Sequence, residues 1–145
     1  MTEEEAEKIA TLLNERNQLV IEYNKERILN TSTNYVFLKD KDKDEIIACA
    51  ESKKVQWYQS EISHVSVSKL YEGQGFGKKI LNKAEKKAKD ERAIILQCTI
   101  RTDNKSSLGL FKSNGYEIVN KFFYENSGNW VYVLQKNTIN KYKRQ

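Results

Sequence analysis

The sequence predicts an α/β fold, a single domain with a mixed sheet flanked by helices. Strand and helix patterns alternate along the second half of the chain, and β-rich segments flank short turns elsewhere. An alternating glycine run joins one of these strands to one helix. The chain has 145 residues, about the size of one domain. We expect residues 1–137 to form that domain and residues 138–145 to form a basic C-terminal tail.

A helix is expected at the N-terminus, because Thr2 and Glu5 have the spacing of a capping box and apolar residues follow at helical spacing. A second helical or irregular stretch is expected at about 18–29. Three strands should then follow, the first two joined by a charged hairpin turn. They are expected at 35–40, 45–59 and 60–68.

The second half should hold two helices and three strands. A helix after the glycine run places apolar residues on one face, and we expect Glu85 and Lys89 on its solvated face at the supportive i,i+4 spacing. The strand at 93–100 is almost continuously apolar, which predicts burial on both faces. A short helix should begin near Asn104 and end before Gly115. An antiparallel hairpin is expected at 116–125 and 130–136.

Charge and cysteine content limit the function classes. The chain carries 25 Lys and Arg against 20 Asp and Glu, a net charge of +5, which suits an anionic ligand but does not by itself favour nucleic acid. No apolar run is long enough to span a membrane and no signal peptide is visible, so a cytoplasmic location is expected. Cys49 and Cys98 are expected as buried free thiols. With His64 as the lone histidine, no metal site is expected.

The stretch "YEGQGFGKK", residues 71–79, holds three of the six glycines at alternating positions. Such a turn between a strand and a helix presents backbone N–H groups at the positive end of the helix dipole, which suits a phosphate or pyrophosphate. It is neither a Walker loop, since position 72 is Glu and Lys79 follows Lys78, nor the dinucleotide fingerprint. The alternative is a flexible connector.

Two segments resemble the motifs of the GNAT family of acyl-CoA-dependent N-acyltransferases. "HVSVSKLYEGQGFGKKIL" resembles motif A, Q/R-x-x-G-x-G/A, through Gly75 and Gly77, with Glu72 at the Gln or Arg position. "NKSSLGLFKSNGYE" resembles motif B, N-x-x-A-x-x-x-Y-x-x-x-G-F, at the separation that the family uses. Its matching residues are Asn104, Gly115 and Tyr116, with Ser107 replacing Ala and Phe111 replacing Tyr. The resemblance covers about 45–136.

The resemblance implies a central, mostly antiparallel, twisted sheet, with an acetyl-CoA site in a V-shaped splay between two central strands. The pantetheine arm would pair with strand backbone at Val65, Ser66 and Val67. Asn104 would touch its pantetheine or adenosine side, and Phe111 would line the acetyl and thiol end. The pyrophosphate would lie on the turn formed by Glu72, Gly73, Gln74, Gly75, Phe76, Gly77 and Lys78.

The resemblance also implies catalytic roles. The backbone N–H of Val65 would donate to the thioester oxygen. Glu61, fourteen residues before Gly75, stands where histone-type members carry a general base, or else it is a strand-edge charge facing water. His64 is the second candidate base, and its strand parity differs from that of Glu61 unless a bulge intervenes. Phe111 lacks the hydroxyl of the family's usual acid, which leaves water or another tyrosine; the tyrosines considered are Tyr116 and Tyr124.

The function implied is acetyl transfer from acetyl-CoA to a primary amine by direct attack in a ternary complex. The acceptor would be a small molecule such as an amino acid, or a protein or peptide amine. "IIACAE", which contains Cys49 and Ala50, resembles N-acetylglutamate synthase-like acetyltransferase domains and favours an amino acid. The alternatives are a non-catalytic CoA-binding or sensing domain, suggested by Phe111 and Glu72, and a nucleic-acid-binding module. A monomer or a homodimer is expected.

Overall fold

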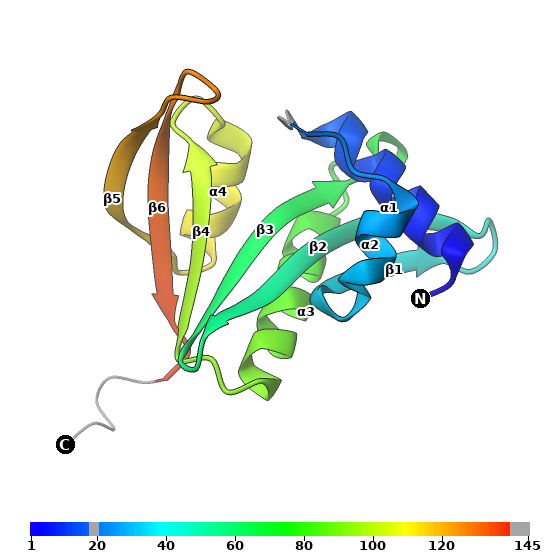
Figure 1. Ribbon diagram of the computed structural model, residues 1–145, viewed down its shortest axis with the longest axis horizontal. Coiled ribbons are helices and arrows are strands. Elements are labelled where there is room, and N and C mark those ends of the chain that lie inside the picture. The colour runs from blue at the N-terminus through cyan, green and yellow to red at the C-terminus, as the bar shows by residue number, and fades with distance from the viewer. Residues whose placement is uncertain (18–20, 140–145) are drawn as a thin grey trace. The chain divides into compact units, whose positions relative to one another are not determined.

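The structure is a computed structural model that describes residues 1–17 and 21–139 (Figure 1). Its strands form a six-stranded mixed sheet in the order β1-β2-β3-β4-β6-β5, with helices flanking it, which confirms the predicted fold class. Residues 140–145 of the predicted basic tail lie outside the described residues. The elements are α1 (Glu3–Arg16), α2 (Lys25–Asn30), η1 (Ser32–Asn34), β1 (Tyr35–Asp40), β2 (Glu45–Gln56), β3 (Gln59–Val67), η2 (Lys69–Tyr71), α3 (Phe76–Asp90), β4 (Ile95–Arg101), α4 (Lys105–Ser113), β5 (Glu117–Tyr124) and β6 (Asn129–Asn137).

The chain divides into two compact units. Unit 1 contains Met1–Ser52 and His64–Ala84, and unit 2 contains Lys53–Ser63 and Glu85–Gln145. β2, β3 and α3 each contribute residues to both. The ends of β3 and β4 that would form the V-shaped splay belong to different units, so the splay stays a prediction.

Unit 1 is built around α1, which starts as predicted. The Thr2 hydroxyl oxygen accepts from the Glu5 N–H at 3.1 Å, and the Glu5 carboxylate accepts from the Thr2 N–H at 2.8 Å. The buried face of α1 then packs on β1 and β2 (Figure 1). That core contains Ala6, Ile9, Ala10, Leu12, Leu13, Ile28, Tyr35, Ile46 and Cys49. The second predicted helical stretch is shorter than expected: α2 begins only at Lys25, and residues 18–20 lie outside the described part of the chain.

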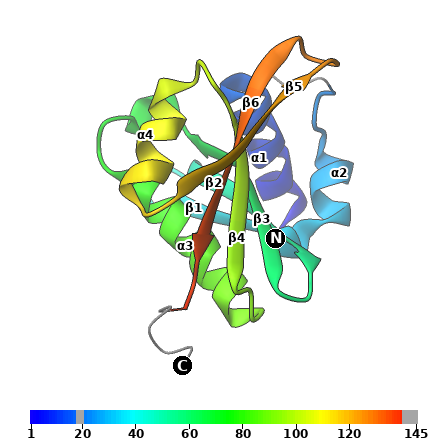
Figure 2. The same ribbon diagram turned by 90° about the vertical axis from the view of Figure 1, so that its left-hand side faces the viewer.

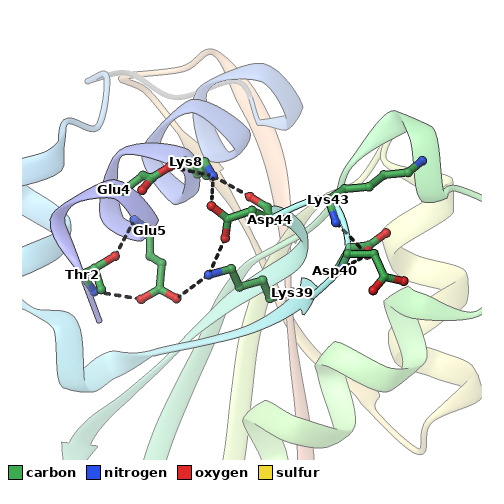
Figure 3. A network of polar contacts seen from close by, with 9 residues as sticks. Thr2, Glu4, Glu5, Lys8, Lys39, Asp40, Lys43 and Asp44 are labelled. Atoms are coloured by element: carbon green, nitrogen blue, oxygen red, sulfur yellow. Dashed lines mark hydrogen bonds and ion pairs between the residues drawn. The ribbon is translucent and has the colours of Figure 1, made fainter.

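A network of charged side chains joins the start of α1 to the turn between β1 and β2 (Figure 3). Lys8 lies 3.2 Å from the Glu4 carboxylate and 3.5 Å from that of Asp44. Lys39 lies 2.7 Å from Asp44 and 3.4 Å from Glu5. Because all these groups reach solvent, the network is expected to orient the hairpin rather than to add much stability.

In unit 2, β6 pairs with both β4 and β5 in antiparallel fashion, and the two last strands form the predicted hairpin (Figure 2). The first residues of β3, Gln59 to Glu61, pair with β4 in parallel. The predicted burial of β4 on both faces is wrong, because the strand alternates and Thr99 is exposed. Its apolar run therefore packs one face, through Leu96, Cys98 and Ile100.

The expectation for Glu85 is also wrong, because this glutamate is buried rather than solvated, at 4% exposure. The Tyr116 hydroxyl donates to its carboxylate at 2.7 Å, and Lys136 Nζ from β6 lies 3.2 Å away. Burial and the Glu85 carboxylate raise the pKa of Tyr116, which keeps that hydroxyl protonated. The buried carboxylate is tolerated because a hydroxyl group and an ammonium group both pair with it.

The Lys136→Met variant should lower the free energy of unfolding by about 3 kcal/mol, because it leaves the Glu85 carboxylate buried without its counter-ion. Urea denaturation of the variant and the parent protein measures this difference. The control is Lys86→Met on the same helix as Glu85, which breaks an exposed pair with Asp90 and should change little. Equal effects of the two variants would contradict the assignment.

Candidate active site

The glycine turn in unit 1 requires two of its glycines for backbone reasons. Gly73 has φ +74° and Gly75 has φ +83°, in the left-handed region that other residues rarely adopt. A Cβ at either position would meet no heavy atom within 4 Å, so the turn faces open space. α3 begins at Phe76, and the N–H of Lys79 donates to the Gly75 carbonyl at 3.3 Å.

The first N–H groups of α3 therefore stand next to an open, side-chain-free turn. In any helix these groups lack an acceptor within the helix, and the helix dipole is positive at this end. Phe76, Gly77 and Lys78 supply them, and Gln74 is an exposed member of the turn. This arrangement can bind an anion such as a diphosphate through the backbone.

The turn is anchored rather than slack. The Tyr71 hydroxyl donates to the Asp40 carboxylate at 2.7 Å and lies 3.2 Å from that of Glu45. The hydrogen bond to Asp40 raises the pKa of Tyr71. On the other side, the Tyr71 ring meets the Phe76 ring edge to face, with centroids 5.9 Å apart. These contacts speak against the flexible-connector alternative.

Glu72, which precedes the first glycine, forms an ion pair with Arg16 at the end of α1. The pair joins the carboxylate Oε1 to the guanidinium Nη2. No pattern in the sequence links these residues, since they lie 56 positions apart. The negative charge of Glu72 beside the turn is therefore paired with the positive charge of Arg16.

His64 in β3 has φ +56°, which interrupts the regular alternation of the strand. The difference in parity between Glu61 and His64 was expected only for a strand without an irregularity, and the positive φ of His64 is such an irregularity. His64 Nε2 and the Tyr23 hydroxyl are 2.8 Å apart, and the Arg27 guanidinium lies 4.2 Å from the centre of the Tyr23 ring. Burial lowers the pKa of His64, and the Glu51 carboxylate opposes that shift.

The pH dependence of stability should report the lowered pKa of His64. The unfolded chain takes up a proton near pH 6.5 while the folded chain does not, so stability is lost as pH falls from 6.5 toward the lower, folded-state pKa. The His64→Asn variant, which tolerates a positive φ, should lose less stability than the parent between pH 7 and pH 5. Urea denaturation across this range measures the difference, and parallel curves for the two proteins would contradict it.

Glu61 lies in unit 2 and is half-buried rather than facing water. Its carboxylate accepts from the Gln97 side-chain amide at 3.2 Å, and the Gln97 oxygen accepts from the Gln135 amide at 2.7 Å. Burial raises the pKa of Glu61, and the Gln97 hydrogen bond partly offsets this. A half-buried carboxylate with a raised pKa is suited to proton transfer near neutral pH.

In the strand predicted to pair with pantetheine, the Ser66 side chain forms two hydrogen bonds. Its buried hydroxyl donates to the His64 carbonyl at 3.0 Å and accepts from the Asn17 amide at 2.8 Å. The flanking Val65 and Val67 are half-buried. The roles of these three residues stay predictions.

The motif B residues fall into unit 2. Asn104 caps α4, with its side-chain oxygen accepting from the Ser107 N–H at 3.2 Å. The Phe111 ring is buried and meets the Tyr116 ring edge to face, with centroids 4.9 Å apart. The geometry does not favour Tyr116 as the acid, because its hydroxyl is committed to Glu85. Tyr124 lies exposed on β5.

Both cysteines are free and buried, as expected. Burial raises the pKa of Cys49 to about 12, so neither reactivity nor metal binding is indicated there. Over residues 1–17 and 21–139, no group of His, Cys, Asp and Glu could hold a metal ion. Within the same residues, the helices are too short or too polar to cross a membrane.

Comparison with known proteins adds a family match. The family model described as "Acetyltransferase (GNAT) family" matches residues 3–116. The match contains the glycine turn, Glu61 and all of motif B. The comparison with curated proteins found no match.

Solved structures share the fold at low sequence identity. Ard1 from Thermoplasma volcanium aligns with a TM-score of 0.81 and 14% identity, covering 97% of this chain and 95% of that one. A ribosomal-protein-alanine N-acetyltransferase from Brucella melitensis gives 0.78 and 18%, covering 94% and 96%. A GNAT family acetyltransferase from Elizabethkingia anophelis with acetyl-CoA bound gives 0.69 and 22%, covering 88% of each chain.

Proposed function

Because this chain belongs to the GNAT acetyltransferase family, we propose that it transfers an acetyl group from acetyl-CoA to a primary amine within a ternary complex. The proposal rests on the anchored turn with positive φ at Gly73 and Gly75. This turn directly precedes α3 and lies next to the first backbone N–H groups of that helix. The turn lies in unit 1 together with residues 64–67 of β3, and both belong to the family match.

The donor would be held by backbone. In this proposal the diphosphate accepts from the N–H groups of the turn, and the pantetheine amide groups pair with β3 at Val65, Ser66 and Val67. By the family resemblance, Asn104 and Phe111 of motif B are proposed as donor-site residues too. Lys78, exposed in the first turn of α3, adds a positive charge near the phosphates.

In the chemical step, Glu61 would take the proton that the amine must lose. The neutral amine nitrogen attacks the thioester carbon, and the carbonyl oxygen, as it gains negative charge, accepts from the Val65 N–H. The nitrogen of the tetrahedral intermediate still carries one extra proton. Collapse breaks the carbon–sulfur bond and releases CoA thiolate, and the nitrogen proton passes through water to that thiolate. The products are the neutral amide and the CoA thiol, and Glu61 returns its proton to solvent. His64 is the second candidate base. Holding both reactants together supplies much of the rate enhancement without further side chains.

The acceptor is proposed to be an amino acid or a protein or peptide amine. The resemblance around Cys49 and Ala50 favours the first, and the name of the Brucella protein, whose fold is similar, makes an N-terminal alanine worth testing. The proposal places the protein in the cytoplasm, as a monomer or a homodimer.

Titration calorimetry with acetyl-CoA, followed by a free-thiol assay, tests the proposal. The acceptor panel should contain free amino acids, glutamate among them, and peptides with N-terminal alanine. Micromolar binding with thiol release on one acceptor supports the enzyme. Binding without release on any acceptor would favour the non-catalytic CoA-binding alternative, and no binding would contradict the donor site.

A further inference from the structure

We propose that Arg16, the last residue of α1, contacts the diphosphate of the acetyl-CoA donor, and that Glu72 is the residue that positions it. The inference rests on the proposed function, because it requires a diphosphate at the glycine turn. The ion pair between the two residues is the observation from which it starts, and both belong to unit 1.

The charges of Arg16 and Glu72 bear directly on the binding of an anion at the glycine turn. Glu72 directly precedes Gly73, so an unpaired carboxylate there would repel a diphosphate held by the turn. Arg16 neutralises this charge through one nitrogen of its guanidinium, which has five N–H donors in total. Both side chains are partly exposed, Arg16 by 28% and Glu72 by 50%, so the pair is accessible to an anion.

The end of α1 is fixed to the strand that leads into the turn. The Asn17 amide donates to the Leu13 carbonyl at 2.9 Å and to the Ser66 hydroxyl of β3 at 2.8 Å. The Arg16 side chain therefore leaves a fixed part of α1, and its guanidinium is paired with Glu72. Ion pairs on a protein surface usually contribute little to stability, so stability alone does not explain why this pair lies beside the turn.

The pair brings to the turn a positive charge that Glu72 itself does not carry. A guanidinium held in a set orientation loses less conformational freedom when it forms charge-assisted hydrogen bonds to a phosphate group. The role of Glu72 is thus to position Arg16, and the role of Arg16 is to bind.

The test compares two donors in the full-length protein. Titration calorimetry measures the Kd for acetyl-CoA, and thermal-shift titration at millimolar concentrations follows S-acetyl-pantetheine, which lacks the diphosphate. Arg16→Met should weaken acetyl-CoA binding about tenfold to one-hundredfold, the loss of charge-assisted hydrogen bonds, and should do so also in a Glu72→Gln background, where no unpaired carboxylate remains to repel the diphosphate. It should leave the response to S-acetyl-pantetheine unchanged. Arg16→Lys should fall between, since it keeps the charge but not the planar geometry.

Lys8→Met is the matched control. It removes one positive charge from the same helix, at a side chain paired with Glu4 and Asp44 away from the turn, and should bind acetyl-CoA like the parent protein (Figure 3). Equal affinity of Arg16→Met and the parent would overturn the role of Arg16 while leaving the donor site standing. Equal loss for both donors would also overturn it. Absence of acetyl-CoA binding by the parent protein would overturn the donor site and this inference together.

Discussion

The Glu61→Gln variant should lower kcat by about 10²–10⁴-fold, the contribution typical of a general base, and leave the Kd for acetyl-CoA unchanged. The amide keeps the size of the side chain and can still accept from Gln97, whose amide lies 3.2 Å from the carboxylate. It cannot take a proton from the amine. The free-thiol assay measures kcat, and calorimetry measures donor binding.

The pH profile gives a second, independent readout of the same role. Burial raises the pKa of Glu61, and only the carboxylate form acts as a base, so kcat/KM should rise with pH through that raised pKa. The rising limb should disappear in Glu61→Gln. In Gln97→Leu, which removes the hydrogen bond that lowers the pKa of Glu61, the limb should move to higher pH.

His64→Asn is the decisive comparison for these results. Full activity in Glu61→Gln together with lost activity in His64→Asn would assign the base to His64. The lowered pKa of His64 keeps its ring neutral near pH 7, a form that can also accept a proton.

The parts of this fold that the sequence predicted are those encoded locally. The capping box of Thr2 and Glu5, the glycine turn before α3 and the start of α4 near Asn104 each depend on residues within a few positions of one another. Apolar periodicity placed most strands and helices for the same reason. Two local signals were misread: α2 begins after Asn24, whose side chain accepts from the Arg27 N–H, and β4 has the alternation of a strand buried on one face.

The features of the site that were not predicted are long-range. Glu85 reads as a surface residue in its helix, and only Tyr116 and Lys136, which follow it by 31 and 51 positions, make it a buried one. Arg16 and Glu72 meet in the same way. The positive φ of His64 could not be predicted either, because this conformation is usually signalled by a glycine and the residue here is a histidine.

Gly75→Glu should weaken acetyl-CoA binding at least about 100-fold, which corresponds to ~2.7 kcal/mol. Two physical effects add. A side chain at φ +83° strains the turn that directs the N–H groups, and the carboxylate stands where the diphosphate is proposed to lie. Calorimetry measures the loss, and Gly75→Ala separates the effects, because alanine brings the backbone strain without the charge.

Gly128→Glu is the matched control, since Gly128 has φ +70° in the turn between β5 and β6 and also faces open space. The two glutamate variants should lose similar stability in urea denaturation, while only the one at Gly75 should lose acetyl-CoA. Parent-like binding by Gly75→Glu would mean that the glycines serve the turn's conformation alone. The diphosphate would then need another site in the fold, and the role of Arg16 would fall with the turn.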